Sequence, residues 1–262
     1  MIRLARIEWL KLRTVRTGFS LLATSAALTA LFASLEASRA GNGKYGVAPL
    51  FSASGLATVT TVTGWSMIFA AVLGVIVASG EFRHYTATLT YLATPDRRRV
   101  LVAKALAVAG AGVIFGLVSA LIATGVGLIF VAGHGYHVAL GTGTLVAHIA
   151  GAAVGAALFG AIGVGIGSLL RSQLAGVIGI FVWALVIESI IGGLFTSVRP
   201  YLPYTAATTL AGIKLGGAAF GPAHGLSGGS PLPFAAAAAL VLGVAALLDV
   251  ITVRTTLRKD VT

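Results

Sequence analysis

The chain has 262 residues, of which 57% are hydrophobic and only 10% are charged, and its mean hydropathy is +0.99. Soluble globular domains carry about 25% charged residues, so the composition excludes an ordinary soluble protein and predicts one surrounded by lipid. Because there is no cysteine, disulfides, thiol catalysis and cysteine metal sites are also excluded.

Apolar segments along the chain predict an all-α polytopic membrane protein with six transmembrane helices. The segments lie at about residues 17–36, 56–80, 100–131, 144–170, 174–196 and 233–253. The first is longer than the apolar region of a signal peptide, so we expect it to be retained as a span. We therefore divide the chain into an interfacial segment at 1–16, a transmembrane domain at 17–253 and a tail at 254–262.

Small residues are frequent in the predicted spans, and the chain has 35 glycines. In lipid, small residues four positions apart let helix backbones approach closely, so Gly151–Gly155 and Gly163–Gly167 predict a tightly packed bundle. The threonines of the second span have two interpretations. They either line a polar path or, as we favour, bond back to carbonyl groups of their own helix; they are Thr58, Thr60, Thr61 and Thr63.

The distribution of Lys and Arg places both termini in the cytoplasm by the positive-inside rule. In that orientation the inner side carries Arg3, Arg6, Lys11, Arg13, Arg16, Arg83, Arg97, Arg98, Arg99, Lys104, Arg171, Arg254, Arg258 and Lys259. The outer side carries only Arg39, Lys44, Arg199 and Lys214. The formal charge of +11 therefore reflects topology signals at helix ends, and we expect no nucleic acid partner.

The inner segment after the second span has a helical pattern of its own. Four side chains fall within about 80° on a helical wheel: Phe82, Tyr85, Leu89 and Leu92. This pattern predicts a short amphipathic helix at about 81–94. Thr94, Pro95 and Asp96 then predict a helix start, with Thr as N-cap, Pro at the first position and an acid in the first turn.

A motif surrounds this segment: Glu-x-Arg after the second span, a Thr, then Pro-x-Arg-Arg and an Ala-Lys that enters the third span. Its residues are Glu81, Arg83, Thr86, Pro95, Arg97, Arg98, Ala103 and Lys104. It resembles the membrane subunits of ATP-binding-cassette (ABC) exporters of the type-2 permease family. The basic N-terminus with its tryptophan and the apolar outer segment 197–232 are similar too, so the resemblance covers essentially the whole chain. Tyr85 stands where the family more often has a small residue.

The resemblance implies a permease subunit of an ATP-driven exporter in a bacterial cytoplasmic membrane, with an amphipathic or hydrophobic cargo such as a drug, antibiotic, peptide or lipid. The helix at 81–94 would be a coupling helix that docks into a separate ATPase subunit. The residues expected to form or support this contact are Glu81, Phe82, Arg83, Tyr85, Thr86, Leu89, Leu92, Pro95, Arg97 and Arg98. Short helices on the outer face are expected in 197–232, before the last span.

The other expected partners are a second copy of the permease, or a related permease, and membrane lipid, to which Arg97–Arg99 can also bind. The sequence contains no GxxxxGK[ST] loop, which is the phosphate cradle of many ATPases. ATP and Mg²⁺ therefore belong on the partner subunit. We expect this chain not to be an enzyme and to hold no cofactor or metal ion itself.

Two polar residues inside the spans, Glu188 and His148, are candidates for a gate or substrate path. A charge at the depth of Glu188 is costly in lipid, so its carboxyl group should be paired, protonated or facing water. The alternative interpretation is a hydrogen-bonded helix contact, with His148 in the adjacent span as the partner. Asp249, near the inner end of the last span, is expected to pair with Arg254 or with another basic residue at that edge.

Two other functional classes are weighed against the exporter. A secondary carrier would have inverted repeats with broken helices near the midplane, and no convincing pair of halves is evident. A rhomboid-like serine protease would use Ser52 or Ser54 with His148 or His134 as base. Those serines, however, fall at the outer start of the second span, and no histidine lies at the corresponding depth of a late span.

Overall fold

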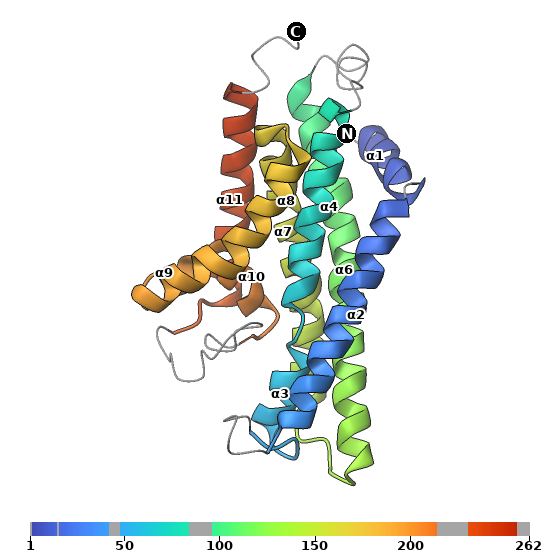
Figure 1. Cartoon of the computed structure of the whole chain (residues 1–262), viewed down its shortest axis with the longest axis vertical. Coiled ribbons are helices and arrows are strands. Elements are labelled where there is room, and N and C mark those ends of the chain that lie inside the picture. Colours follow the sequence, from blue (N-terminus) through green and yellow to red (C-terminus); the bar gives the residue numbers. More distant parts are fainter. Residues whose placement is uncertain (1, 15, 42–47, 84–95, 214–229, 256–262) are drawn as a thin grey trace.

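The computed structural model describes residues 2–14, 16–41, 48–83, 96–213 and 230–255. The chain folds into a bundle of long helices in which α1 and the end of α11 lie at the same end (Figure 1). We call this end, with the end of α4 and the start of α6, the terminal end. The elements are α1 (Ile2–Thr14), α2 (Arg16–Arg39), α3 (Ala53–Thr60), α4 (Gly64–Arg83), α6 (Arg97–Gly133), α7 (Thr142–Leu170), α8 (Gln173–Phe181), the π-helix η2 (Val182–Ile187), α9 (Glu188–Leu194), the 3₁₀-helix η3 (Arg199–Tyr201), α10 (Pro203–Leu210) and α11 (Phe234–Thr255).

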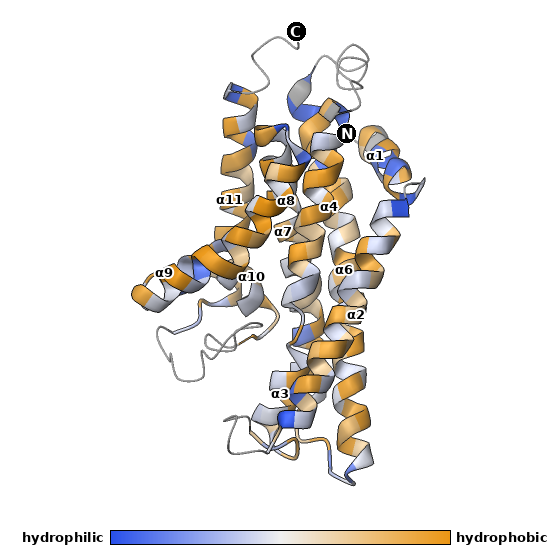
Figure 2. Cartoon of the chain, viewed as in Figure 1, coloured by the Kyte–Doolittle hydropathy of each residue, from blue (hydrophilic) through white to orange (hydrophobic). Residues whose placement is uncertain are grey.

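The predicted architecture is confirmed: the described residues contain no strand and six helical segments long and apolar enough to cross a membrane. The segments are Arg16–Arg39, Ala53–Phe82, Arg98–Gly133, Thr142–Leu170, Gln173–Leu194 and Phe234–Thr255. Apolar residues run along all of them (Figure 2). The protein is therefore an all-α polytopic membrane protein.

The second span is not the continuous helix that was predicted, because it breaks between α3 and α4 at Thr61–Thr63. The predicted hydroxyl bonds occur at the break: Thr60 and Thr61 both donate to the carbonyl of Ala57, at 3.1 and 2.8 Å. Thr58 donates likewise to the carbonyl of Ser54 at 2.9 Å. Such bonds offer the backbone an alternative to the regular ladder and often bend helices.

The helix α4 forms the centre of the bundle, and the predicted glycine contacts pack α7 against it. A Cβ atom on Gly163 would overlap the backbone of Ala71 in α4, and one on Gly167 would lie 2.7 Å from the carbonyl oxygen of Val75. Burying an apolar side chain between two helices gains little free energy when the alternative is contact of that side chain with lipid. Close packing of small residues, rather than hydrophobic burial, therefore determines how these helices fit together.

The fifth span runs through α8, η2 and α9 and leans away from the bundle (Figure 1). Its middle is the π-helix Val182–Ile187, and π-segments inside α-helices are rare and frequent at functional sites. The outer segment then returns to the bundle, as the predicted short helices η3 and α10. Ala206 and Ala207 of α10 are fully buried, so this helix enters the bundle instead of lying on its surface.

Candidate functional site

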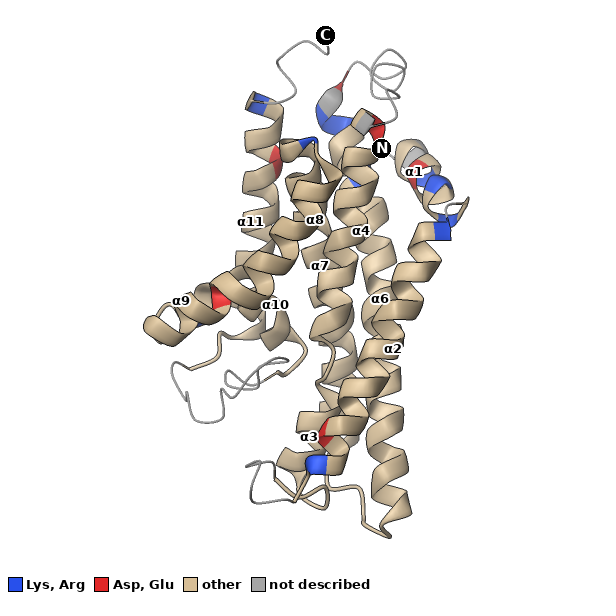
Figure 3. Cartoon of the chain, in the orientation of Figure 1, with Lys and Arg blue, Asp and Glu red and all other residues tan. Residues whose placement is uncertain are grey.

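Charged residues gather at the terminal end of the bundle (Figure 3). At this end α4 finishes just before the predicted coupling segment and α6 begins just after it, while α1 lies beside α6. The site is therefore assembled from three helices, two of which lead into and out of the same segment.

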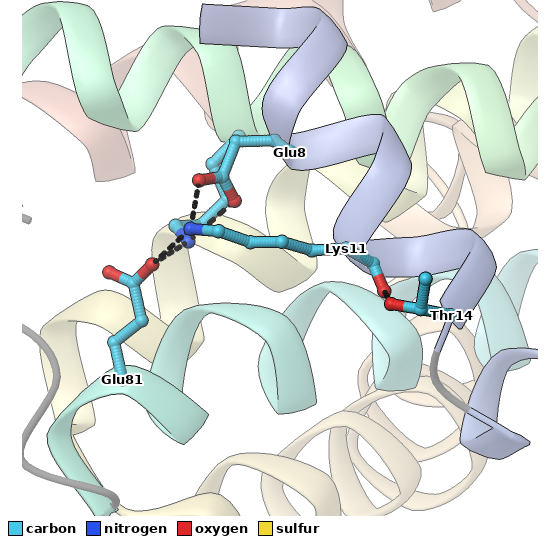
Figure 4. Close-up of polar contacts among 5 residues, drawn as sticks. Glu8, Lys11, Thr14 and Glu81 are labelled. Carbon is cyan, nitrogen blue, oxygen red and sulfur yellow. Dashed lines mark hydrogen bonds and ion pairs between the residues drawn. The ribbon is translucent and has the colours of Figure 1, made fainter.

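Four of these charged side chains form a cluster, which we call the charge cluster: Glu8, Lys11, Glu81 and Lys104. Lys104 on α6 donates to Glu8 Oε2 at 3.0 Å and to Glu81 Oε1 at 2.8 Å. Lys11 donates to Glu8 Oε1 at 2.6 Å and to Glu81 Oε1 at 3.4 Å. Figure 4 shows the Lys11 side chain reaching from α1 between the two carboxylates. Each acid thus meets both bases, and the cluster joins α1, α4 and α6.

Most of the charge cluster is shielded from solvent. The side chains of Lys104, Glu8 and Glu81 are 5%, 7% and 13% exposed, whereas that of Lys11 is 50% exposed. Buried charges carry a desolvation cost of several kcal/mol each, so they persist only when geometry and partners are good. Removing one member would leave its buried partners with less counter-charge than they have in the cluster.

The electrostatics of α1 reflect this pairing. Burial alone would raise the pKa of Glu8, but the charges and hydrogen bonds of Lys104 and Lys11 outweigh it and hold that pKa below its ordinary value. Burial alone would lower the pKa of Lys11, but Glu8 and Glu81 raise it. Both groups therefore stay charged over a wide pH range.

Tight packing places α1 where Glu8 can reach Lys104. A Cβ atom on Gly110 of α6 would lie 3.2 Å from Cζ3 of Trp9, so the indole ring rests on a position that has no side chain. Leu12, one turn further along α1, packs against the apolar core. The face of α1 that carries Trp9 and Leu12 is therefore partly buried against the core, and Glu8 is buried beside them.

A second contact lies at the end of α4. The guanidinium carbon of Arg171 lies 5.1 Å from the centroid of the Phe82 ring, which is within the range of a cation–π interaction. Arg171 is the C-cap of α7, in the left-handed conformation with φ of 53°. The contact links the end of α4 to the turn between α7 and α8.

The structure places some of the predicted coupling residues and leaves others outside the described part. Glu81 belongs to the charge cluster and Phe82 contacts Arg171, while Arg83 is the last residue of α4. Arg97 begins α6 and Arg98 is exposed. The residues that lie outside the described part are Tyr85, Thr86, Leu89, Leu92 and Pro95. The amphipathic helix at 81–94 therefore stays a prediction.

The helix start assigned to Thr94 is wrong. The N-cap of α6 is Asp96, whose side chain accepts a hydrogen bond from the backbone N–H of Arg99 at 3.3 Å. Asp is among the strongest N-cap residues, and here its carboxylate also pairs with the Arg99 side chain at 2.8 Å. The arginines that open α6 follow directly on this cap.

The predicted pair between Glu188 and His148 is also wrong. Glu188 is 3% exposed and its carboxylate accepts from the backbone N–H groups of Tyr204 and Thr205, at 2.7 and 2.8 Å. The Thr205 hydroxyl and the Trp183 indole N–H donate to it at 3.0 and 2.7 Å. The N–H groups at the start of α10 have no partner within their own helix, and such groups favour a carboxylate.

His148 instead lies close to the Thr60 hydroxyl, with 3.3 Å between Nδ1 and Oγ1. Its ring also faces Gly212, where a Cβ atom would lie 2.5 Å from Nε2. The residue therefore fills the space between α7, the end of α3 and the chain just after α10. Within the described ranges, His, Asp and Glu form no group of three that could hold a metal ion.

Asp249 does not pair with Arg254. Its Oδ1 is buried without a hydrogen-bond partner, next to Gly165 of α7, while Arg254 is exposed. Residues five apart lie about 140° apart around an α-helix, so the two side chains point in different directions. The prediction failed because it considered distance along the span but not the helical angle.

Comparison with models of protein families and with curated proteins gives no match to this chain.

Proposed function

We propose that this protein is the membrane-spanning subunit of an ATP-driven exporter of the ABC type-2 permease family. The proposal rests on the six-span architecture, on the sequence motif from Glu81 to Lys104 and on the charge cluster. Both termini would be cytoplasmic in a bacterial cytoplasmic membrane, so the terminal end would face the cytoplasm. The cargo would be an amphipathic or hydrophobic molecule.

The charge cluster is the observation that carries the proposal. Glu81 lies three residues before the segment 84–95, and Lys104 lies nine residues after it. The Lys104 ammonium group donates a hydrogen bond to Glu81 Oε1 at 2.8 Å. Both are tied in turn to Glu8 and Lys11 of α1. A force applied to the segment between them would therefore act on α1, α4 and α6 together.

That arrangement suits a subunit that receives mechanical work from a partner. The segment 84–95 would dock into the ATPase, and closure of the ATPase pair would move it. Since buried salt bridges resist separation, the three helices would move as one body, and α2 would follow α1. Two copies of this chain, or this chain and a related permease, would form the path for the cargo.

Co-purification tests the proposal. The candidate partner is the product of a neighbouring reading frame that contains a Walker A loop. We expect it to purify with the chain and to hydrolyse ATP faster in the complex than alone. Changing Phe82, Tyr85 and Leu89 together to Asp should abolish both effects. Retention of the complex with unchanged ATP turnover would contradict the proposal.

The break between α3 and α4 favours a secondary carrier as the second candidate, because carriers use discontinuous helices around their binding sites. A carrier would transport in vesicles that contain this chain alone and an ion gradient. The exporter would transport only when the ATPase and ATP are present. The serine-protease alternative has less support, since the Ser52 hydroxyl accepts from Gly55 N–H at 3.1 Å as the N-cap of α3.

A further inference from the structure

The contacts of Glu188 connect the fifth span to α10, a helix that begins inside the bundle. Its N-cap residue, Leu202, provides no side-chain hydrogen bond, and the first helical residue, Pro203, has no N–H. The N–H groups of Tyr204 and Thr205 come next, and Glu188 accepts a hydrogen bond from each. A carboxylate from another element therefore caps α10.

Neighbouring helices enclose α10 on several sides. A Cβ atom on Gly155 of α7 would lie 2.8 Å from the carbonyl oxygen of Ala207, and one on Gly151 would overlap the backbone of Leu210. On α4, a Cβ atom on Gly64 would lie 2.5 Å from the hydroxyl oxygen of Tyr204. The helix α11 also packs against it. The helix thus fills the space between α4, α7 and α11.

Hydrophobic burial cannot be what keeps α10 in this place. Its sequence is PYTAATTL, and Ala206, Ala207 and Leu210 of this helix are buried in the core. In a membrane, lipid tails are as apolar as a protein core, and packing and hydrogen bonds decide helix association. An uncapped helix start within the membrane costs several kcal/mol for each unpaired group. The three hydrogen bonds that α10 donates to Glu188, from Tyr204 N–H, Thr205 N–H and the Thr205 hydroxyl, therefore hold the start of this helix specifically.

We propose that Glu188 is the latch that seats α10 as a removable plug in the bundle, at the side away from the terminal end. Releasing the carboxylate would leave the start of α10 unpaired and drive it toward water. That this plug serves as the outer gate rests on the proposed exporter function. The latch itself requires neither transport nor ATP.

The absence of cysteine from the chain allows the position of α10 to be followed with single thiols. Thr208→Cys reports on α10, because Thr208 is 8% exposed and its hydroxyl donates to the carbonyl of Thr205 in its own helix. Thr29→Cys, at a fully buried position of α2, reports on global unfolding. Thr144→Cys, at an exposed position of α7, gives the labelling rate of a fully accessible thiol for comparison.

The experiment measures the rate at which a water-soluble maleimide labels each thiol in the purified chain. Glu188→Gln should raise the labelling of the Thr208→Cys thiol about tenfold or more, since an amide keeps one of the two acceptor oxygens and so two of the four donors lose their acceptor. Thr205→Val, which removes one hydroxyl, should give a smaller rise. Trp183→Phe, which leaves all bonds to α10 intact, should give none.

Each outcome decides the proposal. Labelling of the Thr208→Cys thiol at the parental rate in both Glu188→Gln and Thr205→Val would overturn it, as would an equal rise in Trp183→Phe. If Glu188→Gln unfolds the protein, so that the Thr29→Cys thiol is labelled as well, the test rests on the milder Thr205→Val variant. If the Thr29→Cys thiol is labelled in the Thr205→Val variant too, α10 does not move separately from the bundle, and the proposal is overturned. If the latch proposal were overturned, the exporter proposal would still stand, because the labelling experiment uses the purified chain without an ATPase partner.

Discussion

Lys104 Nζ lies 3.0 Å from Glu8 Oε2, although 96 positions separate the two residues in the chain. Lys104 closes the family-like motif, while Glu8 stands in the middle of the basic N-terminal helix. Their contact brings the motif and α1 into one buried charge cluster. The predictions below follow from that contact and from the helix packing around it.

Lys104→Met should destabilise the protein strongly, because it removes the buried counter-charge from the carboxylates of Glu8 and Glu81 and leaves them the half-exposed Lys11. Breaking a buried pair in this way costs about 3–5 kcal/mol. Lys11→Met is the matched control: Lys11 contacts the same two acids but is half exposed, so its loss should cost about 1 kcal/mol or less. Thermal unfolding of the purified variants measures both. Equal losses for the two variants would show that burial of Lys104 does not matter.

The stability of the wild-type protein should fall in acid more steeply than that of Glu8→Gln. The pKa of Glu8 is lowered by folding from an ordinary value of 4.5. Its contribution is therefore present above about pH 4.5 and is lost as the pH falls through the lower folded pKa. Lys11 acts in the opposite direction: folding raises its pKa from 10.5, so its contribution is lost as the pH rises above that value.

The measurement is the difference in unfolding temperature between wild type and Glu8→Gln as the pH is lowered. The difference should be largest near neutral pH and shrink below about pH 4.5. Other acids titrate in both proteins and cancel in the comparison. A difference that stays constant into acid would contradict the pairing of Glu8.

Gly112→Ala should force α6 and α7 apart. The added Cβ atom would lie 2.6 Å from the carbonyl oxygen of Ala156, and overpacking of this kind typically costs about 1–3 kcal/mol. Gly125→Ala, in the same helix, meets nothing within 4 Å and gains helix propensity. The first variant should unfold at a lower temperature than wild type and the second at the same or a higher one.

In the proposed complex, Glu8→Gln should reduce transport several-fold while ATP hydrolysis continues. The change loosens the hold of α1 on α4 and α6 without touching the segment 84–95. Glu36→Gln serves as the control, because Glu36 is an acid of α2 that pairs with Arg39 at 3.8 Å, away from the charge cluster. A parallel fall in ATP turnover and transport for Glu8→Gln would contradict a role of α1 in transmission.

Much of the architecture could be predicted from the sequence because lipid imposes simple rules. A span must be long and apolar, and small residues mark close helix contacts. The interior breaks were missed for the same reason. The π-helix at Val182–Ile187 lies in an uninterrupted apolar sequence, so no composition-based rule detects it. The threonines near the end of α3 at Thr60 were interpreted as bonding within a continuous helix.

The candidate site was only half predictable. Glu81 and Lys104 belong to a motif, whereas Glu8 and Lys11 belong to none. The available signal was the acid Glu8 within a basic N-terminal helix, since an acid that becomes buried needs a cation beside it. Which cation it meets depends on how α1 packs on α6, through Trp9 and Gly110, and such packing is not encoded in a local pattern.

The role of Glu188 shows the same limit. Its cost in lipid could be predicted from the sequence, but its partner could not. The N–H groups that bind it belong to α10, and backbone groups at a helix start are available to any acid that reaches them. A search among ionisable side chains therefore pointed to His148 and missed these backbone N–H groups.

The central claim is that work enters this protein through the segment between α4 and α6. Its most direct test is cross-linking of a single cysteine placed at Leu89, with Thr144→Cys at an exposed position near the start of α7 as the control. Our account predicts that the thiol at position 89 cross-links to the ATPase subunit and that the one at position 144 does not. A cross-link from position 144 alone, or none from position 89 in a complex that hydrolyses ATP, would contradict it.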